Sequence, residues 1–127
     1  MTHPFRTAVE ARDRAAMTAL MAPDVRFFSP VAFHPFVGRE SAAELFSNLL
    51  EVFEDFHYVD ELEGDGTHAL VFRATVGGKS LEGLDHLRFD ADGLVSEFTV
   101  MIRPLSGLVA IGVAMGPRVG HLPKGDA

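Results

Sequence analysis

The apolar residues change period from about 3.6 to 2 near residue 56, and this change limits the folds open to the chain. Three turn signals divide the second half: GDG at 64–66, GG at 77–78 and DADG at 90–93. Alternating apolar residues between tight turns indicate strands that run antiparallel to their neighbours. We therefore predict a four-stranded meander, with strands at about 56–63, 67–76, 79–89 and 94–103.

The first half of the chain has helical spacing instead. Residues 4–24 carry apolar side chains near a period of 3.6, and Asp13 offers an N-cap for a second short helix that ends before Pro23. The run DVRFFS at 24–29 favours a short strand, and the prolines of residues 30–38 indicate a loop.

Two further helices are expected outside this region. Residues 39–53 place Ala42, Phe46 and Leu49 on one stripe, which predicts an amphipathic helix. Residues 105–115 are apolar almost all round, and they predict a short buried helix or a cap over an open end of the fold.

Length and composition indicate one globular domain. The 127 residues are 47% hydrophobic and 23% charged, and we assign the domain to residues 1–116 with a flexible tail at 117–127. The net charge of −7 argues against nucleic acid or an anionic membrane as a partner, because both select clustered Lys and Arg. There is no apolar run of ~20 residues and no signal-peptide core near the start, so a cytoplasmic location is expected.

Metal and thiol chemistry have little support in the residue types. The chain has no cysteine, which excludes disulfides and thiolate sites. Its six histidines show neither H-x-H nor HExxH spacing. We expect no metal and no cofactor.

The stretch EGLDHLRFD at 82–90 places a carboxylate among apolar residues. Strand alternation puts Asp85 on the same face as Leu81 and Leu87, whereas the opposite face is mostly charged. A two-residue turn at GG pairs Asp85 with Leu70, and a four-residue loop at DADG pairs it with Phe98. Both hairpins predict that Asp85 points inward.

The first strand allows two registers, depending on the length of the GDG loop. A three-residue loop places Phe56, Tyr58, Asp60 and Leu62 on the inner face. A two-residue loop places His57, Val59 and Glu61 there. The apolar content favours the first register, in which Asp60 and Asp85 share a row roughly 10 Å apart. Tyr58 then lies in the row of Gly83, whose missing side chain leaves room beside it.

An inward carboxylate with no Lys or Arg on its own face should have a raised pKa, because burial disfavours its charged form. Such an acid can donate a hydrogen bond to a developing oxyanion or act as a general base near neutral pH. The alternative is a purely structural Asp85 that accepts hydrogen bonds from backbone amides, a tyrosine or water.

Residues 5–115 resemble the SnoaL-like members of the nuclear transport factor 2-like superfamily, which includes ketosteroid isomerases and polyketide cyclases. The resemblance is strongest in DVRFFSPV, FVGRE and GLDHLRFDADGLVSE. It implies an α+β fold, a cystatin-like roll in which a curved antiparallel sheet wraps around N-terminal helices as a cone. It also implies a small-molecule pocket at one end of the cone.

By this resemblance Asp85 matches the aspartic acid that donates to the oxyanion in ketosteroid isomerases. Ser29 stands where those enzymes carry the general base and Phe5 where they carry a tyrosine, so that isomerisation mechanism is not expected. Gly83 stands where the epoxide-hydrolase branch carries an arginine, which counts against hydrolase chemistry. A cyclase-like activity needs mainly one acid in an apolar pocket, and it fits best.

We therefore expect an enzyme acting on a hydrophobic carbonyl metabolite, or else a non-catalytic binding protein or a scaffold without a site. The candidate catalytic residues are Asp85, His34, Tyr58 and Asp60. The expected pocket residues are Phe28, Phe36, Phe46, Leu49, Phe53, Leu70, Phe72, Leu87, Phe98, Val100 and Ile102. The outer face of the sheet is more apolar than a solvent face, which favours a homodimer through that face. Its apolar and neutral residues are Val59, Val71, Leu84, Thr99 and Met101.

Overall fold

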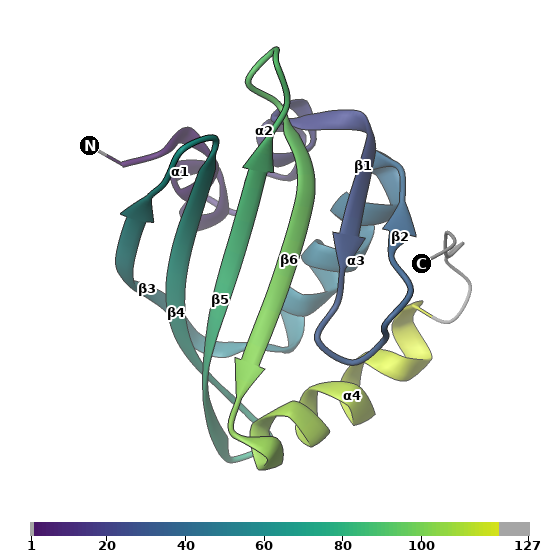
Figure 1. Cartoon of the computed structure of the whole chain (residues 1–127). Coiled ribbons are helices and arrows are strands. Elements are labelled where there is room, and N and C mark those ends of the chain that lie inside the picture. Colours follow the sequence, from purple (N-terminus) through teal and green to yellow (C-terminus); the bar gives the residue numbers. More distant parts are fainter. Residues whose placement is uncertain (1, 120–127) are drawn as a thin grey trace.

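The computed structural model describes residues 2–119, and within them it contains four helices and one six-stranded sheet (Figure 1). The elements in chain order are α1 (Pro4–Glu10), α2 (Arg14–Ala19), β1 (Met21–Phe28), β2 (Phe36–Val37), α3 (Arg39–Val52), β3 (Glu54–Glu63), β4 (Thr67–Val76), β5 (Lys79–Phe89), β6 (Val95–Arg103) and α4 (Leu105–Val119). The fold is α+β with a curved sheet, as predicted from the family resemblance, and the sheet is not closed.

The sheet has the strand order β2-β1-β6-β5-β4-β3. The predicted meander is confirmed, because β3, β4, β5 and β6 pair in sequence and antiparallel. Two features of the other edge were not predicted. β1 runs parallel to β6, and the two-residue strand β2, too short to show a period, pairs with β1 from within the expected loop.

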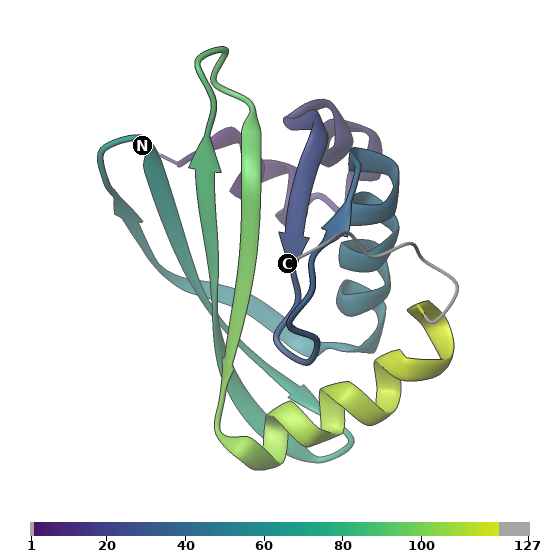
Figure 2. The same cartoon turned by 45° about the vertical axis from the view of Figure 1, so that its right-hand side comes forward.

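The concave side of the sheet is covered by helices (Figures 1 and 2). The ring of Phe98 on β6 lies 5.2 Å from Phe5 of α1, 4.7 Å from Phe27 of β1 and 5.0 Å from Phe46 of α3, measured between ring centroids. All four rings are buried. Tilted and edge-to-face aromatic contacts of this kind hold helix and sheet together and leave the centre of the cone filled.

The N-cap predicted at Asp13 is confirmed, but α2 ends at Ala19 and β1 begins at Met21, before the predicted strand start at Asp24. The side chain of Asp13 accepts a hydrogen bond of 3.0 Å from the amide of Ala16 and so caps α2. α3 follows Gly38, which has a φ of 99°, a conformation that strongly favours glycine.

Helix α4 lies across one end of the sheet (Figure 2). It packs against α3 and against strands β4, β5 and β6, so it caps the open end of the cone as expected. A Cβ atom at Gly107 would lie 2.7 Å from Leu81 Cβ, so the glycine permits this close approach. The helix is longer and less buried than predicted: it continues to Val119, and Leu105, Val109 and Val113 face outward. Residues 120–127 of the expected tail lie outside the described residues.

Strand β3 contains an irregularity that reverses the faces of its second half. Tyr58 lies opposite Phe72, but Asp60 lies opposite Val71 and Glu61 opposite Leu70, with a register shift between Tyr58 and Asp60. The prediction that Asp60 faces inward is therefore wrong. A β-bulge adds one residue to the strand, and one extra residue moves every later side chain to the other face.

Candidate functional site

Asp85 on β5 points into the interior and has no exposed surface. It lies between Leu70 of β4, as predicted, and Val100 of β6. The expected partner on β6 was Phe98, two residues away. A five-residue loop and a register shift between Arg88 and Phe89 account for the displacement. A displacement of two residues keeps the same face, so the inward direction of Asp85 was predicted correctly.

The carboxyl group of Asp85 has a single hydrogen bond. The hydroxyl of Tyr58 donates to Oδ2 at 2.8 Å, and both side chains are buried. Oδ1 is also buried and has no partner among the described residues. Burial raises the pKa of Asp85 to about 7, although the hydrogen bond from Tyr58 acts in the opposite direction. Burial, and then the neighbouring Asp85, raise the pKa of Tyr58 well above its usual value.

The space beside Gly83 is occupied by the chain itself. Tyr58, Phe72 and Gly83 share one row of the sheet, as predicted. A Cβ atom at Gly83 would overlap the Phe72 ring. The glycine therefore makes room for the aromatic ring that packs beside Tyr58, with 6.5 Å between ring centroids, and not for a ligand.

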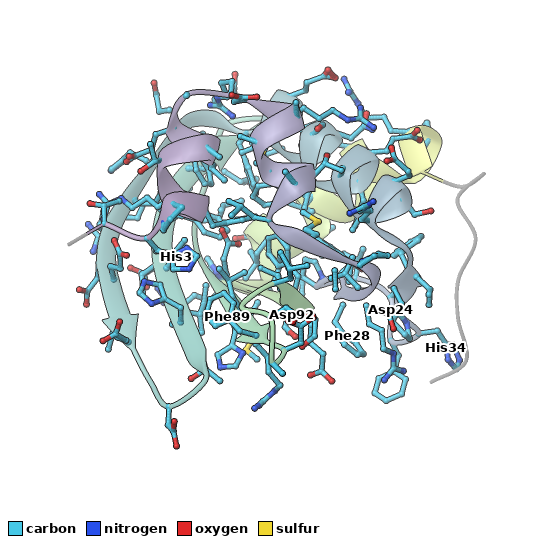
Figure 3. The ribbon with its side chains drawn as sticks, turned by 90° about the horizontal axis from the view of Figure 1, so that it is seen from above. His3, Asp24, Phe28, His34, Phe89 and Asp92 are labelled. Carbon is cyan, nitrogen blue, oxygen red and sulfur yellow. The ribbon has the colours of Figure 1, made fainter. Side chains whose placement is uncertain are left out.

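The remaining catalytic candidates lie away from this pair. Asp60 is exposed on β3 and accepts a hydrogen bond from the amide of Glu61. His34 is exposed in the loop between β1 and β2, and Figure 3 shows it at the edge of the molecule. Of the four predicted groups, the structure thus brings together only Tyr58 and Asp85.

An apolar pocket of about 200 Å³ lies at the open end of the cone. The loop between β1 and β2, helix α3 and helix α4 form its walls. Ser29 contributes a hydroxyl, Leu45 and Leu49 come from α3, and Ile111 and Met115 come from α4. Asp85 and Tyr58 line neither this pocket nor the four shallower hollows identified on the described residues.

The expected pocket residues divide into three groups. Phe36 and Leu49 line the pocket at the open end, while Phe28 and Ile102 line two shallower hollows. The others are buried in the core: Phe46, Phe53, Leu70, Phe72, Leu87, Phe98 and Val100.

Sequence reasoning missed a polar cluster formed by His3, Arg6, Glu61 and His68, which we call the Glu61 cluster. One oxygen of Glu61 accepts from the His3 amide at 2.8 Å and lies 2.6 Å from His68 Nε2. The other accepts from Arg6 at 3.1 Å. Burial opposes ionisation, but these hydrogen bonds from His3, His68 and Arg6 lower the pKa of Glu61 to about 2.

The cluster was missed because the favoured register of the first strand placed Glu61 on the outer face, whereas in the structure Glu61 lies opposite the inward Leu70. In the structure the His3 ring stacks on Phe89, 5.1 Å between centroids, and the two are neighbours in Figure 3. The alternative two-residue loop would have placed Glu61 inside, but it would have placed Tyr58 outside. Only a bulge brings both inward.

The outer face of the sheet is partly exposed. On the outer sheet face Val59 and Met101 are exposed, and Val71, Leu84 and Thr99 are partly buried, so the homodimer stays a prediction.

Within residues 2–119 no helix is long and apolar enough to cross a membrane. In the same residues no three His, Asp or Glu side chains converge as metal ligands would.

Comparison with known proteins places this architecture in a family. The SnoaL-like domain family matches residues 3–98. The structure is similar to that of a steroid delta-isomerase from Pseudomonas aeruginosa, with 40% identity, a TM-score of 0.86, and coverage of 91% of this chain and 86% of that chain. It is also similar to a bacterial protein with a cystatin-like fold from Silicibacter pomeroyi, with 30% identity, a TM-score of 0.87, and coverage of 93% and 84%.

A more distant structure shows the fold alone. A SnoaL-like protein from Burkholderia thailandensis has 19% identity and a TM-score of 0.65, with coverage of 80% of this chain and 90% of that chain. No curated protein sequence matches the chain. The family match over most of the chain and the two relatives at 30% identity or above show that the chain belongs to the SnoaL-like domain family.

Proposed function

We propose that this protein is an enzyme acting on the carbonyl group of a small apolar molecule, with Asp85 as the hydrogen-bond donor to the carbonyl oxygen. The observation that carries the proposal is the Asp85 carboxyl group, which is fully buried, bonded to Tyr58 through Oδ2 and, within residues 2–119, without a hydrogen-bond partner at Oδ1. With a pKa of about 7, a large fraction of this carboxyl is protonated at neutral pH. A protonated acid in an apolar setting stabilises an oxygen that gains negative charge during reaction.

The similarity to a steroid delta-isomerase supports carbonyl chemistry but not the same set of catalytic groups. Ser29 accepts hydrogen bonds from the amides of Val31 and Ala32, and Phe5 is buried in the core. Neither residue supplies a strong base, and Phe5 has no polar group that could act as a second donor. This favours reactions that need an oxyanion donor more than a base.

Cyclisation of a substrate that carries its own acidic carbon is such a reaction. An enol carbon forms a bond to the carbonyl carbon, the carbonyl π bond breaks, and its oxygen takes a proton from Asp85. The enol hydroxyl loses its proton, which restores the carboxyl group and closes the proton balance. Asp85 thus acts once as donor and once as acceptor, as a group with a pKa near the working pH can.

We propose that a substrate reaches Asp85 from the apolar pocket at the open end of the cone. Asp85 has no exposed surface, so a ligand must move side chains aside to reach it. The apolar pocket at the open end, between the β1–β2 loop and α4, is the natural entrance, because its walls suit an apolar molecule. Because side chains must move, we expect the association rate constant to lie below the diffusion limit.

The test compares turnover by Asp85→Asn with turnover by Asp60→Asn on a panel of β,γ-unsaturated ketones and diketones that can cyclise. Asn cannot transfer a proton, and loss of an oxyanion donor typically lowers kcat by about 10²–10³-fold. Asp60 is the matched control, because it is a carboxylate exposed on the same sheet. Full activity in Asp85→Asn, or an equal loss in Asp60→Asn, would refute the proposal.

A second candidate function is non-catalytic binding of a small apolar molecule in the pocket at the open end. It is favoured by the separation of that pocket from Asp85 and by its volume of about 200 Å³. This is below the roughly 300–1,000 Å³ of sites for drug-sized ligands, so the molecule would be small.

Gly112 provides a direct test of the binding function. It lines the pocket, and a Cβ atom at this position would lie 3.4 Å from Cγ1 of Val31, another lining residue. Gly112→Leu should therefore fill part of the pocket and abolish binding of 1-octanol or a naphthalene dye, whereas Gly112→Ala should retain it. Binding that survives in Gly112→Leu and is lost in Asp85→Asn would favour the enzyme proposal instead.

A further inference from the structure

A positively charged side chain lies over the ring of the tyrosine that pairs with Asp85. The guanidinium carbon of Arg6 on α1 is 5.6 Å from the centroid of the Tyr58 ring. This is within the distance at which a cation is attracted to the face of an aromatic ring. The contact joins α1 to β3 at the residue that donates to Asp85.

The position of Arg6 is set by two carboxylates. Its Nε donates to Glu10 at 3.2 Å, and a terminal nitrogen donates to Glu61 at 3.1 Å. The Arg6 side chain is only about a quarter exposed, with a relative exposure of 24%. A guanidinium held at two of its donors keeps one plane and one direction, which a single ion pair would not ensure.

Glu61 also holds the start of α1 against the sheet. Its second oxygen binds the backbone amide of His3 and the ring of His68, so one carboxylate joins the N-terminus, α1, β3 and β4. The bulge in β3 makes this possible, because Tyr58 and Glu61 are three residues apart and yet both face inward. The same backbone irregularity thus places the phenol and the residue that anchors its cation.

We propose that Arg6 and Glu61 are positioning residues for Tyr58: Glu61 anchors Arg6, and Arg6 orients and polarises the phenol that donates to Asp85. A cation at the ring face stabilises negative charge on the phenol and so makes its O–H a stronger hydrogen-bond donor. Arg6 acts to lower the pKa of Tyr58, against the larger effects of burial and Asp85. The consequence for catalysis rests on the proposed function, whereas the orientation of Tyr58 does not.

The chain offers a clean spectroscopic signal for this contact. It contains one tyrosine and no tryptophan, so its near-ultraviolet circular dichroism in the tyrosine band and its tyrosine emission report on Tyr58 alone. A ring held in one orientation gives a strong band, and a ring that samples several gives a weak one. The measurement needs no substrate.

The test uses Arg6→Met, Arg6→Lys and Glu61→Gln, with Arg88→Met as the control. Arg88 pairs with Glu97 at 3.5 Å and is about half exposed, so its loss removes an arginine without touching Tyr58. We expect the tyrosine band to fall at least twofold in Arg6→Met and Glu61→Gln, to be partly retained in Arg6→Lys and to be unchanged in Arg88→Met. Arg6→Lys keeps the charge and should fold even where Arg6→Met does not.

Turnover supplies a second readout that separates this inference from the proposed function. If the enzyme proposal holds, Arg6→Met should lower kcat about tenfold with little change in KM, because a misplaced donor affects the transition state most. A native tyrosine band in both Arg6→Met and Glu61→Gln would overturn the positioning role. Loss of the band, with no turnover even by the unsubstituted protein, would uphold the positioning role and refute the proposed function.

Discussion

Asp85 and Glu61 lie on the inner face of the same sheet, in one row, on either side of Leu70. Their carboxyl groups nevertheless behave in opposite ways. The pKa of Asp85 is raised to about 7 and that of Glu61 is lowered to about 2. Two positions with the same strand geometry thus favour a neutral acid in one case and a carboxylate in the other.

The difference comes from the number and charge of the hydrogen-bond donors. Asp85 is fully buried and receives one hydrogen bond from the part of the chain that the structure describes, and its donor is a neutral phenol. Glu61 receives bonds from a backbone amide, an imidazole and a guanidinium, and its side chain keeps 15% exposure. Burial penalises charge at both positions, but only Glu61 has enough donors to overcome it. Inward direction alone therefore does not determine the protonation state of a carboxylate.

The largest expected effect is the loss of the Asp85 contribution to the pH dependence of stability. Below about pH 4 Asp85 is protonated in both the folded and the unfolded chain. Between about pH 4 and 7 Asp85 stays protonated only in the folded chain. The free energy of unfolding therefore falls as the pH rises through this range, and it levels off above pH 7. The shift from 3.8 to about 7 corresponds to about 4 kcal/mol. Urea unfolding across this range should show the slope in the native protein and not in Asp85→Asn. A native slope retained in the variant would show that Asp85 ionises normally.

The second effect is the opposite pH dependence at Glu61. Its pKa is lowered from 4.5 to about 2, so its stabilisation is present above pH 4.5 and is lost as the pH falls toward 2. Glu61→Gln should remove this loss of stability at acid pH. At pH 7 it should lower the free energy of unfolding by about 2 kcal/mol, because it replaces hydrogen bonds to a charged group by weaker ones. Glu54→Gln, at an exposed position of the same strand, is the control and should be neutral. Equal urea midpoints for both variants would contradict the comparison.

A smaller effect tests whether hydrogen-bond donors cause the difference in pKa between Asp85 and Glu61. Val100 lies directly opposite Asp85 and is buried, so Val100→Thr places a hydroxyl next to the carboxyl group without adding volume. We expect the pKa of Asp85 to fall by about one unit, as carboxyl NMR can measure, because a new donor stabilises the charged form. Val95→Thr, a buried control opposite Phe89, should leave the Asp85 titration unchanged.

The smallest effect concerns the charges of the outer face. Arg88 and Glu97 form an ion pair of 3.5 Å with both side chains about half exposed. Arg88→Ala should change the free energy of unfolding by less than about 0.5 kcal/mol, because exposed ion pairs are screened by water and salt. Urea unfolding at low and high salt would check this, and a loss as large as that of Glu61→Gln would remove the distinction between inner and outer carboxylates.

The sequence by itself determined the four-stranded meander, the inward direction of Asp85 and the cap at Asp13. These features follow from local rules: strand alternation, turn residues and side-chain capping. The inward direction of Asp85 tolerated an error of two residues in the β5–β6 register, because an even displacement keeps the face. The family resemblance added the curved sheet around helices.

Only the tertiary structure decided which other groups accompany Asp85. The bulge between Tyr58 and Asp60 changed the face of Glu61 and Asp60, and no turn signal in the sequence marks it. The packing of α1 then decided where Arg6 lies. The packing of α4 decided that the pocket at the open end does not include Asp85. The physical reason is that a strand period tells which side chains share a face, whereas a bulge and the contacts between distant elements depend on the folded chain as a whole.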